Sequence, residues 1–190
     1  MPSRRRLLST FTIATLAGAQ LLSVPAPAEA PRQTPGPDLA VGQGVEPPWP
    51  RLYIKDAYVR DAVSEALDGA GERLSTPQCQ GLLSEFADRR GRLLRDRLVD
   101  LNLDLNDYLR ALIFEDGERQ RPCSKHGVLA FTTIGGRIIF VCGRTFARAW
   151  RRDPAEVRAT IIHELLHSLG LGENPPTPRQ ITYRVQKLCW

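Results

Sequence analysis

A small α+β domain is the fold class that the sequence predicts, and three observations support it. Apolar residues recur with helical spacing through most of residues 56–113, two runs rich in β-formers follow at 128–133 and 137–142, and helical spacing returns from residue 153. Strands that are grouped in one hairpin between sets of helices are typical of an α+β arrangement. The expected order is N-terminal helices, a hairpin-based sheet, a long apolar helix and a C-terminal helix.

Residues 1–28 have the composition of a signal peptide. Three arginines are followed by an apolar stretch and then by small residues with Ala-x-Ala spacing. Cleavage after Ala28 is favoured over cleavage after Ala30, because Pro31 would follow the second bond. We therefore expect an exported bacterial protein, periplasmic or secreted, with no stable membrane insertion after cleavage. Sec export, twin-arginine export and an uncleaved anchor remain open.

The rest of the chain is expected to hold one folded domain. Residues 29–51 are rich in Pro and Gly and predict a flexible linker, so the domain is placed at residues 52–190. The net charge of the 190-residue chain is +5, and removal of the three arginines of the signal segment lowers it to +2. This small excess gives no support for nucleic-acid binding.

Four cysteines, Cys79, Cys123, Cys142 and Cys189, remain in the domain. An even number in an exported chain predicts two disulfides, for which three pairings are possible. Cys123 and Cys142 flank the predicted hairpin, which favours a bond between them and leaves Cys79 for Cys189. A thiolate metal site is disfavoured because no CxxC spacing is present.

The helical stretch before the hairpin divides into several elements. The first helix is expected to cover residues 56–67 and to end at Gly69–Gly71. A second helix begins at Thr76–Pro77, with proline at its first position. The Leu-rich segment 92–113 is expected to form two helices, of which the second covers residues 106–113.

The β-rich runs are joined by Ile134-Gly135-Gly136, which predicts a tight hairpin. A short helix over residues 144–150 follows, and a more strongly marked one begins at Asp153. Asp153 can cap it, Pro154 suits its first turn, and Glu156 stands where a capping box needs an acid. Its wide apolar face predicts burial and consists of Val157, Ile161, Ile162, Leu165, Leu166 and Leu169. Gly170 is expected to end it.

This apolar helix carries the chain's chemical motif, His163-Glu164-Leu165-Leu166-His167. Residues four apart lie on one helix face, so both imidazoles can reach one metal ion. Glu164 lies about 100° further round the helix, from where it can approach a metal-activated water as a general base. Burial of these polar groups among aliphatic residues would be costly without a ligand. The motif therefore predicts a zinc site.

The residues after His167 extend the motif to HExxHxxGxxE. This pattern resembles the metzincin branch of the zincin metallopeptidases, whose motif is HExxHxxGxxH or HExxHxxGxxD. The resemblance implies that His163, His167 and Glu173 bind zinc, that Glu164 is the general base, and that Gly170 forms the turn. Glu replaces His or Asp at the third position, and the only methionine is Met1 in the signal segment, so the family's methionine turn is absent. His126 is the alternative third ligand.

The resemblance also carries expectations about the surroundings of the site. A zincin binds extended substrate along a strand at the edge of its sheet, and residues 137–142 are placed to be that strand. Some zincins stabilise the oxyanion with a tyrosine or a basic residue, for which Tyr183 or Arg184, on a last helix that begins at Thr177, is the candidate. The tail at residues 169–182 is also similar to uncharacterised exported bacterial proteins.

The predicted function is thus that of an exported zinc metallopeptidase that acts on a peptide or protein substrate. Two alternatives stay open. One is a non-catalytic zincin-like protein that keeps the metal for structure, although a structural site would need no Glu164. The other is a zinc amidase that acts on cell-wall peptides.

Overall fold

The computed structural model describes residues 50–190, and it confirms the α+β class. The helices are α1 (Ala57–Leu74), α2 (Pro77–Gln80), α3 (Leu82–Glu85), α4 (Leu94–Leu101), α5 (Leu105–Arg110), α6 (Gly143–Arg152), α7 (Pro154–Ser168) and α8 (Pro178–Cys189), with a 3₁₀ turn η1 (Arg121–Ser124). The strands are β1 (Arg51–Tyr53), β2 (Ile113–Asp116), β3 (Ala130–Thr132) and β4 (Ile138–Val141). The predicted signal peptide and nearly all of the predicted linker lie outside the described residues.

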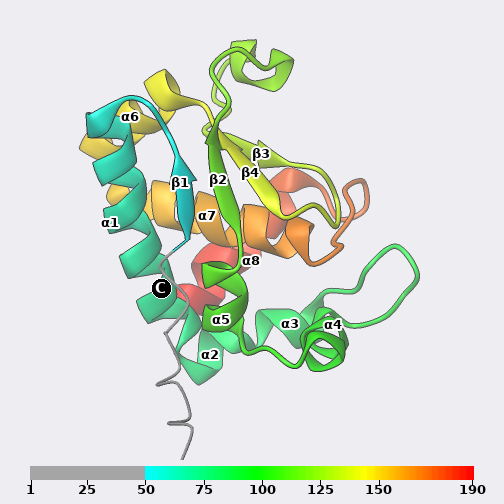
Figure 1. The fold of residues 1–190 in the computed structure, drawn as a ribbon. Helices are drawn as coiled ribbons and strands as arrows, with labels where there is room; N and C mark the ends of the chain where they lie inside the picture. Colours follow the sequence, from blue (N-terminus) through cyan, green and yellow to red (C-terminus); the bar gives the residue numbers. More distant parts are fainter. Residues whose placement is uncertain (1–49) are drawn as a thin grey trace, which may run out of the picture. The chain divides into compact units, whose positions relative to one another are not determined.

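The four strands form one mixed sheet in the order β1-β2-β4-β3 (Figure 1). β1 pairs with β2, and β2 with β4, in parallel. β3 and β4 are antiparallel, with Phe131 opposite Phe140, which confirms the predicted hairpin. The expectation that residues 137–142 form an edge strand is wrong, because β4 has a neighbouring strand on each side. The edge strands are β1 and β3.

The two parallel strands β1 and β2 were not predicted. Ile113 was expected to end a helix, but it begins β2 and pairs with Ile138. Leu112 and Phe114 on either side of it are 0% and 1% exposed. So short an apolar run has no clear periodicity, and a buried strand in the middle of a sheet looks like a helix end in the sequence. Pairing with β1 and β4 on either side makes residues 113–116 a strand.

α7 is the central helix, and in Figure 1 it crosses behind the sheet. It packs against α1, α6, α8 and β3. Its aliphatic side chains are buried as predicted, with Val157, Ile162 and Leu165 at 0% exposed. A helix that is enclosed on several sides holds its side chains in fixed positions, and this matters for the residues that it carries.

The first predicted helix end is wrong, because α1 continues through Gly69 and Gly71 to Leu74. The reason is close packing: a Cβ atom at Gly69 would lie 2.4 Å from Nε of Arg158 on α7. Gly69 therefore allows α1 to pack closely against α7 and does not form a turn. Gly81, by contrast, does divide the second predicted helix, which forms the two short helices α2 and α3.

Both predicted disulfides are present. Cys79–Cys189 joins α2 to the end of α8 across a sequence separation of 110 residues, and Cys123–Cys142 joins η1 to the residue after β4. Two disulfides are compatible with an exported protein, since such bonds persist in oxidising compartments. Among the described helices, none combines the length and the apolar character that a membrane span needs.

Candidate metal centre

The start of α7 is fixed by Asp153, as predicted. Its carboxylate accepts hydrogen bonds from the backbone N–H groups of Ala155, at 3.0 Å, and Glu156, at 3.2 Å. The expected reciprocal bond from Glu156 is absent among the described contacts, because that side chain bonds to Arg152 at 2.7 Å. Gly170, with φ +116°, reverses the chain after the helix. α7 is thus anchored at both ends.

Three predicted ligands meet at one face of α7. His163 Nε2 lies 2.9 Å from His167 Nε2, and Glu173 Oε1 lies 3.2 Å from His167 Nε2 and 4.0 Å from His163 Nε2. Both histidines are buried, whereas the Glu173 side chain is 39% exposed. Among the described residues, this is the group of three whose donor atoms could hold one metal ion.

The hydrogen bonds of His167 direct its Nε2 toward Glu173 and His163. Its Nδ1 lies 2.8 Å from the carbonyl oxygen of Leu171, which can only accept, so Nδ1 carries the proton. Nε2 then faces the carboxylate oxygen of Glu173 at 3.2 Å and Nε2 of His163 at 2.9 Å. A metal ion could lie between these atoms, held by the two imidazoles and the carboxylate.

His163 is held in a similar way from a different element. Its Nδ1 lies 3.0 Å from Oγ1 of Thr182 on α8, which leaves Nε2 facing His167. Burial, and then the charge of His167, lower the pKa of His163 to about 3. The ring is therefore neutral, the form that a metal ligand requires. Sequence reasoning missed Thr182, because no spacing rule relates it to His163, 19 residues earlier.

The donor set and its spacing fit zinc. Bonds of about 2.0–2.2 Å in a tetrahedral zinc site place neighbouring donor atoms about 3.3 Å apart. The three observed separations, 2.9, 3.2 and 4.0 Å, bracket this value. Two imidazoles and one carboxylate are also among the ligand sets of catalytic zinc sites, which keep a further position open.

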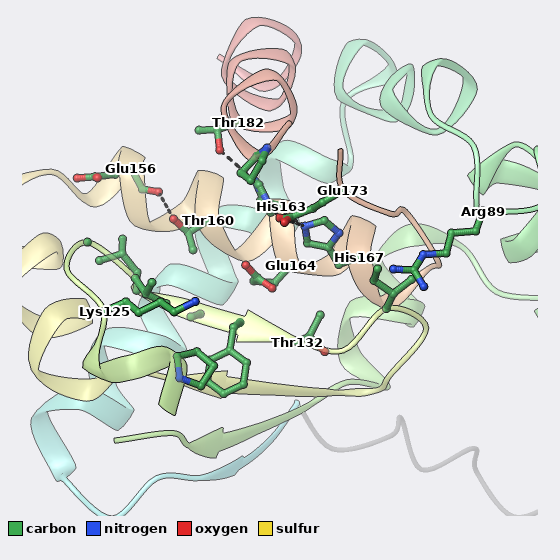
Figure 2. A pocket seen from close by; sticks show the side chains of 18 residues that line it. Arg89, Lys125, Thr132, Glu156, Thr160, His163, Glu164, His167, Glu173 and Thr182 are labelled. Atoms are coloured by element: carbon green, nitrogen blue, oxygen red, sulfur yellow. Dashed lines mark hydrogen bonds and ion pairs between the residues drawn. The ribbon is translucent and has the colours of Figure 1, made fainter. Parts of the chain in front are cut away.

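Glu164 is separate from the ligand group and lies beside it (Figure 2). It is 7% exposed, and its carboxylate accepts a hydrogen bond from the backbone N–H of Thr132 on β3. Burial raises the pKa of Glu164 to about 8; the Thr132 bond opposes this rise and the charge of Glu173 adds to it. A carboxyl group with a pKa near neutrality can both accept and return a proton.

A cleft of about 730 Å³ opens over these residues. Its floor is α7 with His163, Glu164 and His167, and one wall is the segment 127–132 that contains β3. Arg89 and Lys125 also line it, and Figure 2 shows them on opposite sides of Glu164. The four predicted site residues therefore share one cavity that solvent can enter.

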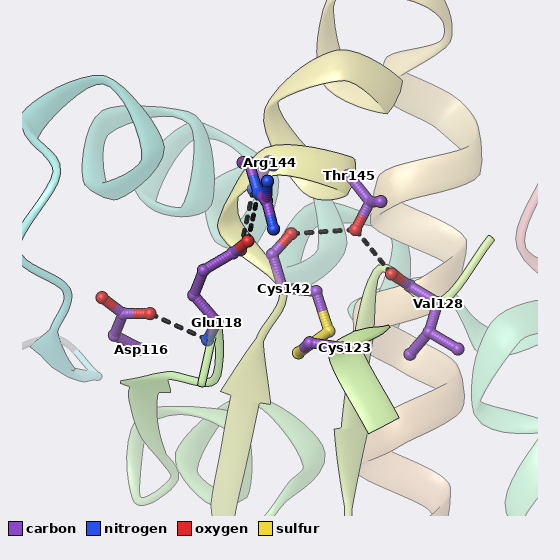
Figure 3. Close-up of polar contacts among 7 residues, drawn as sticks. All are labelled: Asp116, Glu118, Cys123, Val128, Cys142, Arg144 and Thr145. Atoms are coloured by element: carbon purple, nitrogen blue, oxygen red, sulfur yellow. Dashed lines mark hydrogen bonds and ion pairs between the residues drawn. A yellow bond between two sulfur atoms is a disulfide. The ribbon is translucent and has the colours of Figure 1, made fainter. Parts of the chain in front are cut away.

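The wall of this cleft is held in place by contacts at its base (Figure 3). Cys142, after β4, is bonded to Cys123, and Thr145 on α6 donates a hydrogen bond of 2.6 Å to the carbonyl oxygen of Val128. Glu118 bonds to Arg144 beside them. β3 is thus fixed relative to α7 although it lies at the edge of the sheet.

The alternative candidates do not reach the cleft. His126 is exposed and does not belong to the ligand group. Tyr183 is 60% exposed, and Arg184 forms an ion pair with Glu85 on α3. None of the three lines the cavity. Glu173 is therefore the described side chain that completes the group.

No protein-family model, curated protein sequence or solved structure matches this chain. The inference of function therefore depends on the site itself. That site consists of two buried imidazoles, a partly exposed carboxylate from a neighbouring loop, and a buried carboxylate in the same cleft.

Proposed function

We propose that this protein is a zinc-dependent peptidase that acts outside the cytoplasm. The observation that carries the proposal is the placement of Glu164 beside, and not within, the His163–His167–Glu173 group. A structural metal site needs ligands but no neighbouring buried base. The predicted signal peptide and the two disulfides support the location.

The residues of the site have separate roles in the proposed reaction. Zinc, when bound by His163, His167 and Glu173, supplies Lewis-acid chemistry: it polarises a carbonyl and lowers the pKa of water. Glu164 accepts a proton from the attacking water and returns it to the leaving amine. Thr182 and the Leu171 carbonyl keep the two imidazoles oriented, as groups around zinc sites commonly do.

The open edge of β3 supports an extended peptide as the substrate. The Cys142 N–H donates to the Leu129 carbonyl at 2.9 Å, so Leu129 and, by alternation, Phe131 direct their backbone groups toward β4. Ala130 and Thr132 then direct theirs toward the cleft, where the Thr132 N–H bonds to Glu164 and the groups of Ala130 face outward. A peptide could add to this edge by backbone pairing, which would bring a scissile bond above Glu164.

The test is the Glu164→Gln variant, which keeps the shape of the side chain and removes the base. Zinc content should stay at the wild-type level, while hydrolysis of a mixed peptide library should fall by roughly 100- to 10,000-fold, the usual contribution of a general base. Mass spectrometry of the digest measures the activity. Equal activity in both proteins, or none in zinc-loaded wild type, would contradict the proposal.

The same experiment separates the two alternatives. A non-catalytic zinc protein would bind zinc equally well in wild type and Glu164→Gln and would cleave nothing. A zinc amidase for cell-wall peptides would leave the library intact but would cleave isolated peptidoglycan peptides, again with dependence on Glu164. The open β3 edge favours the peptidase over both.

A further inference from the structure

A run of arginines lies next to the proposed metal centre. Residues 88–100 contain five arginines and three aspartates. Arg92 pairs with Asp88 and Asp100, and Arg95 pairs with Asp96. No ion pair within the described part of the chain involves Arg89, Arg90 or Arg97. Three guanidinium groups in this segment therefore keep their charge available.

These three arginines line a second cavity, of about 280 Å³. Its other walls are Asp88, Arg92, the β3–β4 turn at Ile134 and Gly135, and the end of α7 at Leu169 and Gly170. Arg89 and Ile134 line both this cavity and the metal cleft. The basic cavity is thus adjacent to the cleft, and Arg89 lies at the boundary between the two.

The loop that carries Arg89 is held by Asp88. Its carboxylate accepts hydrogen bonds from the backbone N–H groups of Arg90, at 2.8 Å, and Arg92, at 3.0 Å. Asp88 also forms a β-bridge with Leu171, in the segment that leads from His167 to Glu173. The position of the loop is therefore tied to the chain that carries two of the proposed ligands.

The side chain of Arg89 is positioned by a glycine. A Cβ atom at Gly172 would lie 3.3 Å from both Cγ and Nε of Arg89, so the arginine packs closely over this residue. Gly172 is adjacent to Glu173 in the chain. In Figure 2 the guanidinium group extends from its loop toward the His167 side of the cleft. A group bound by Arg89 would therefore lie beside the proposed zinc ligands.

We propose that Arg89, with Arg97 and Arg90 behind it, forms a subsite for a carboxylate group of the substrate. The inference rests on the proposed peptidase function and names its substrate class, namely peptides with an acidic group near the cleaved bond. A guanidinium group matches a carboxylate with two parallel hydrogen bonds, and several such groups in one recess strengthen the attraction. The carboxylate can belong to a Glu or Asp side chain or to a free C-terminus.

Binding without turnover tests this subsite. The protein is the zinc-loaded Glu164→Gln variant, and the probes are fluorescent, amidated peptides in which a single Glu is moved along an otherwise uncharged sequence. Matched peptides carry Gln in place of Glu, and one further peptide carries Gln and a free C-terminal carboxylate. Fluorescence polarisation gives the dissociation constants, and the two kinds of acidic peptide distinguish the source of the carboxylate.

The best acidic peptide should bind about tenfold more tightly than its Gln counterpart, as expected for a charge-assisted hydrogen bond. The added substitution Arg89→Gln should remove this preference. The matched control Arg95→Gln should keep it, because Arg95 pairs with Asp96 and lines neither cavity. High salt should reduce the preference in the parent and leave the Gln peptide little affected.

Several results would overturn the subsite. These are equal affinities for Glu and Gln peptides, failure of all peptides to bind, a preference that survives Arg89→Gln, or a preference that depends on Lys125→Gln instead. The proposed function has a separate readout, which is turnover by the wild-type protein. An acidic preference in binding without wild-type turnover would preserve the subsite and reject the peptidase.

Discussion

The proposed metal centre combines two regions of different character, the buried helix α7 and the loop that follows it. α7 supplies His163, Glu164 and His167, which are 8%, 7% and 5% exposed and are enclosed by packed elements. The loop supplies Glu173, whose side chain is 39% exposed. The helix therefore fixes the geometry of two ligands in advance, while the loop adds the negative charge that completes the site.

The loop is nevertheless held near both ends. The Leu171 N–H donates to the Leu166 carbonyl at 3.1 Å, and Asp88 bridges to Leu171. At its far end, Thr177 and Gln180 form a reciprocal capping box that starts α8. Between these anchors, the position of the Glu173 side chain depends on its contacts with His163 and His167. Loss of a helix ligand should therefore weaken zinc binding more than loss of the loop ligand.

The largest expected effect is that of His167→Ala. Structural zinc sites bind the metal with about 10–16 kcal/mol, so loss of one protein ligand is expected to cost about 3–5 kcal/mol, or roughly 1000-fold in affinity. Glu173→Gln should weaken zinc binding less, by roughly 100-fold, because the amide oxygen stays available as a neutral donor on a mobile side chain. Competition with a chelator of known affinity measures both values.

The control for these zinc affinities is that both variants keep the wild-type fold. Circular dichroism should show that both variants keep the secondary structure of wild type, since the disulfides and the aliphatic core are untouched. The comparison between helix and loop would be wrong if Glu173→Gln lost zinc as completely as His167→Ala, or if Glu173→Gln changed the affinity by less than about twofold.

A smaller effect is expected for Thr182→Val, which removes the hydroxyl group beside His163 Nδ1. Zinc affinity should fall by about tenfold, as for other groups that orient a ligand without touching the metal. Thr160→Val is the matched control, because its hydroxyl bonds to the Glu156 carbonyl within α7 and contacts neither histidine. Equal zinc affinities for the two variants would show that Thr182 does not position His163.

Much of α7 could be predicted from the sequence because its signals are local. The cap at Asp153, the aliphatic spacing and the four-residue interval between the histidines all lie within one helix, and the structure agrees with each. Gly170 also marks its own turn, since the backbone there has φ +116°. The position of Gly170 in the motif also identifies Glu173, three residues later, as a candidate ligand.

The surroundings of the site depend on contacts between distant residues, and these the sequence did not reveal. Thr182 reaches His163 from another helix, and Arg89 reaches the cleft from a loop nearly 80 residues before His167. The edge strand was assigned to residues 137–142 instead of β3 because β2 was not recognised as a strand. A buried strand of four residues carries too little pattern to be identified without its neighbours.

Whether His163, His167 and Glu173 bind zinc can be measured as the metal content of the purified wild-type protein. Elemental analysis by mass spectrometry should find about one zinc ion per chain, as expected for a site with two buried imidazoles and a carboxylate. The same measurement on the His163→Ala/His167→Ala double variant should find almost none. A folded wild-type protein that contains no zinc, and takes up none when zinc is supplied, would show that these residues do not form a zinc site.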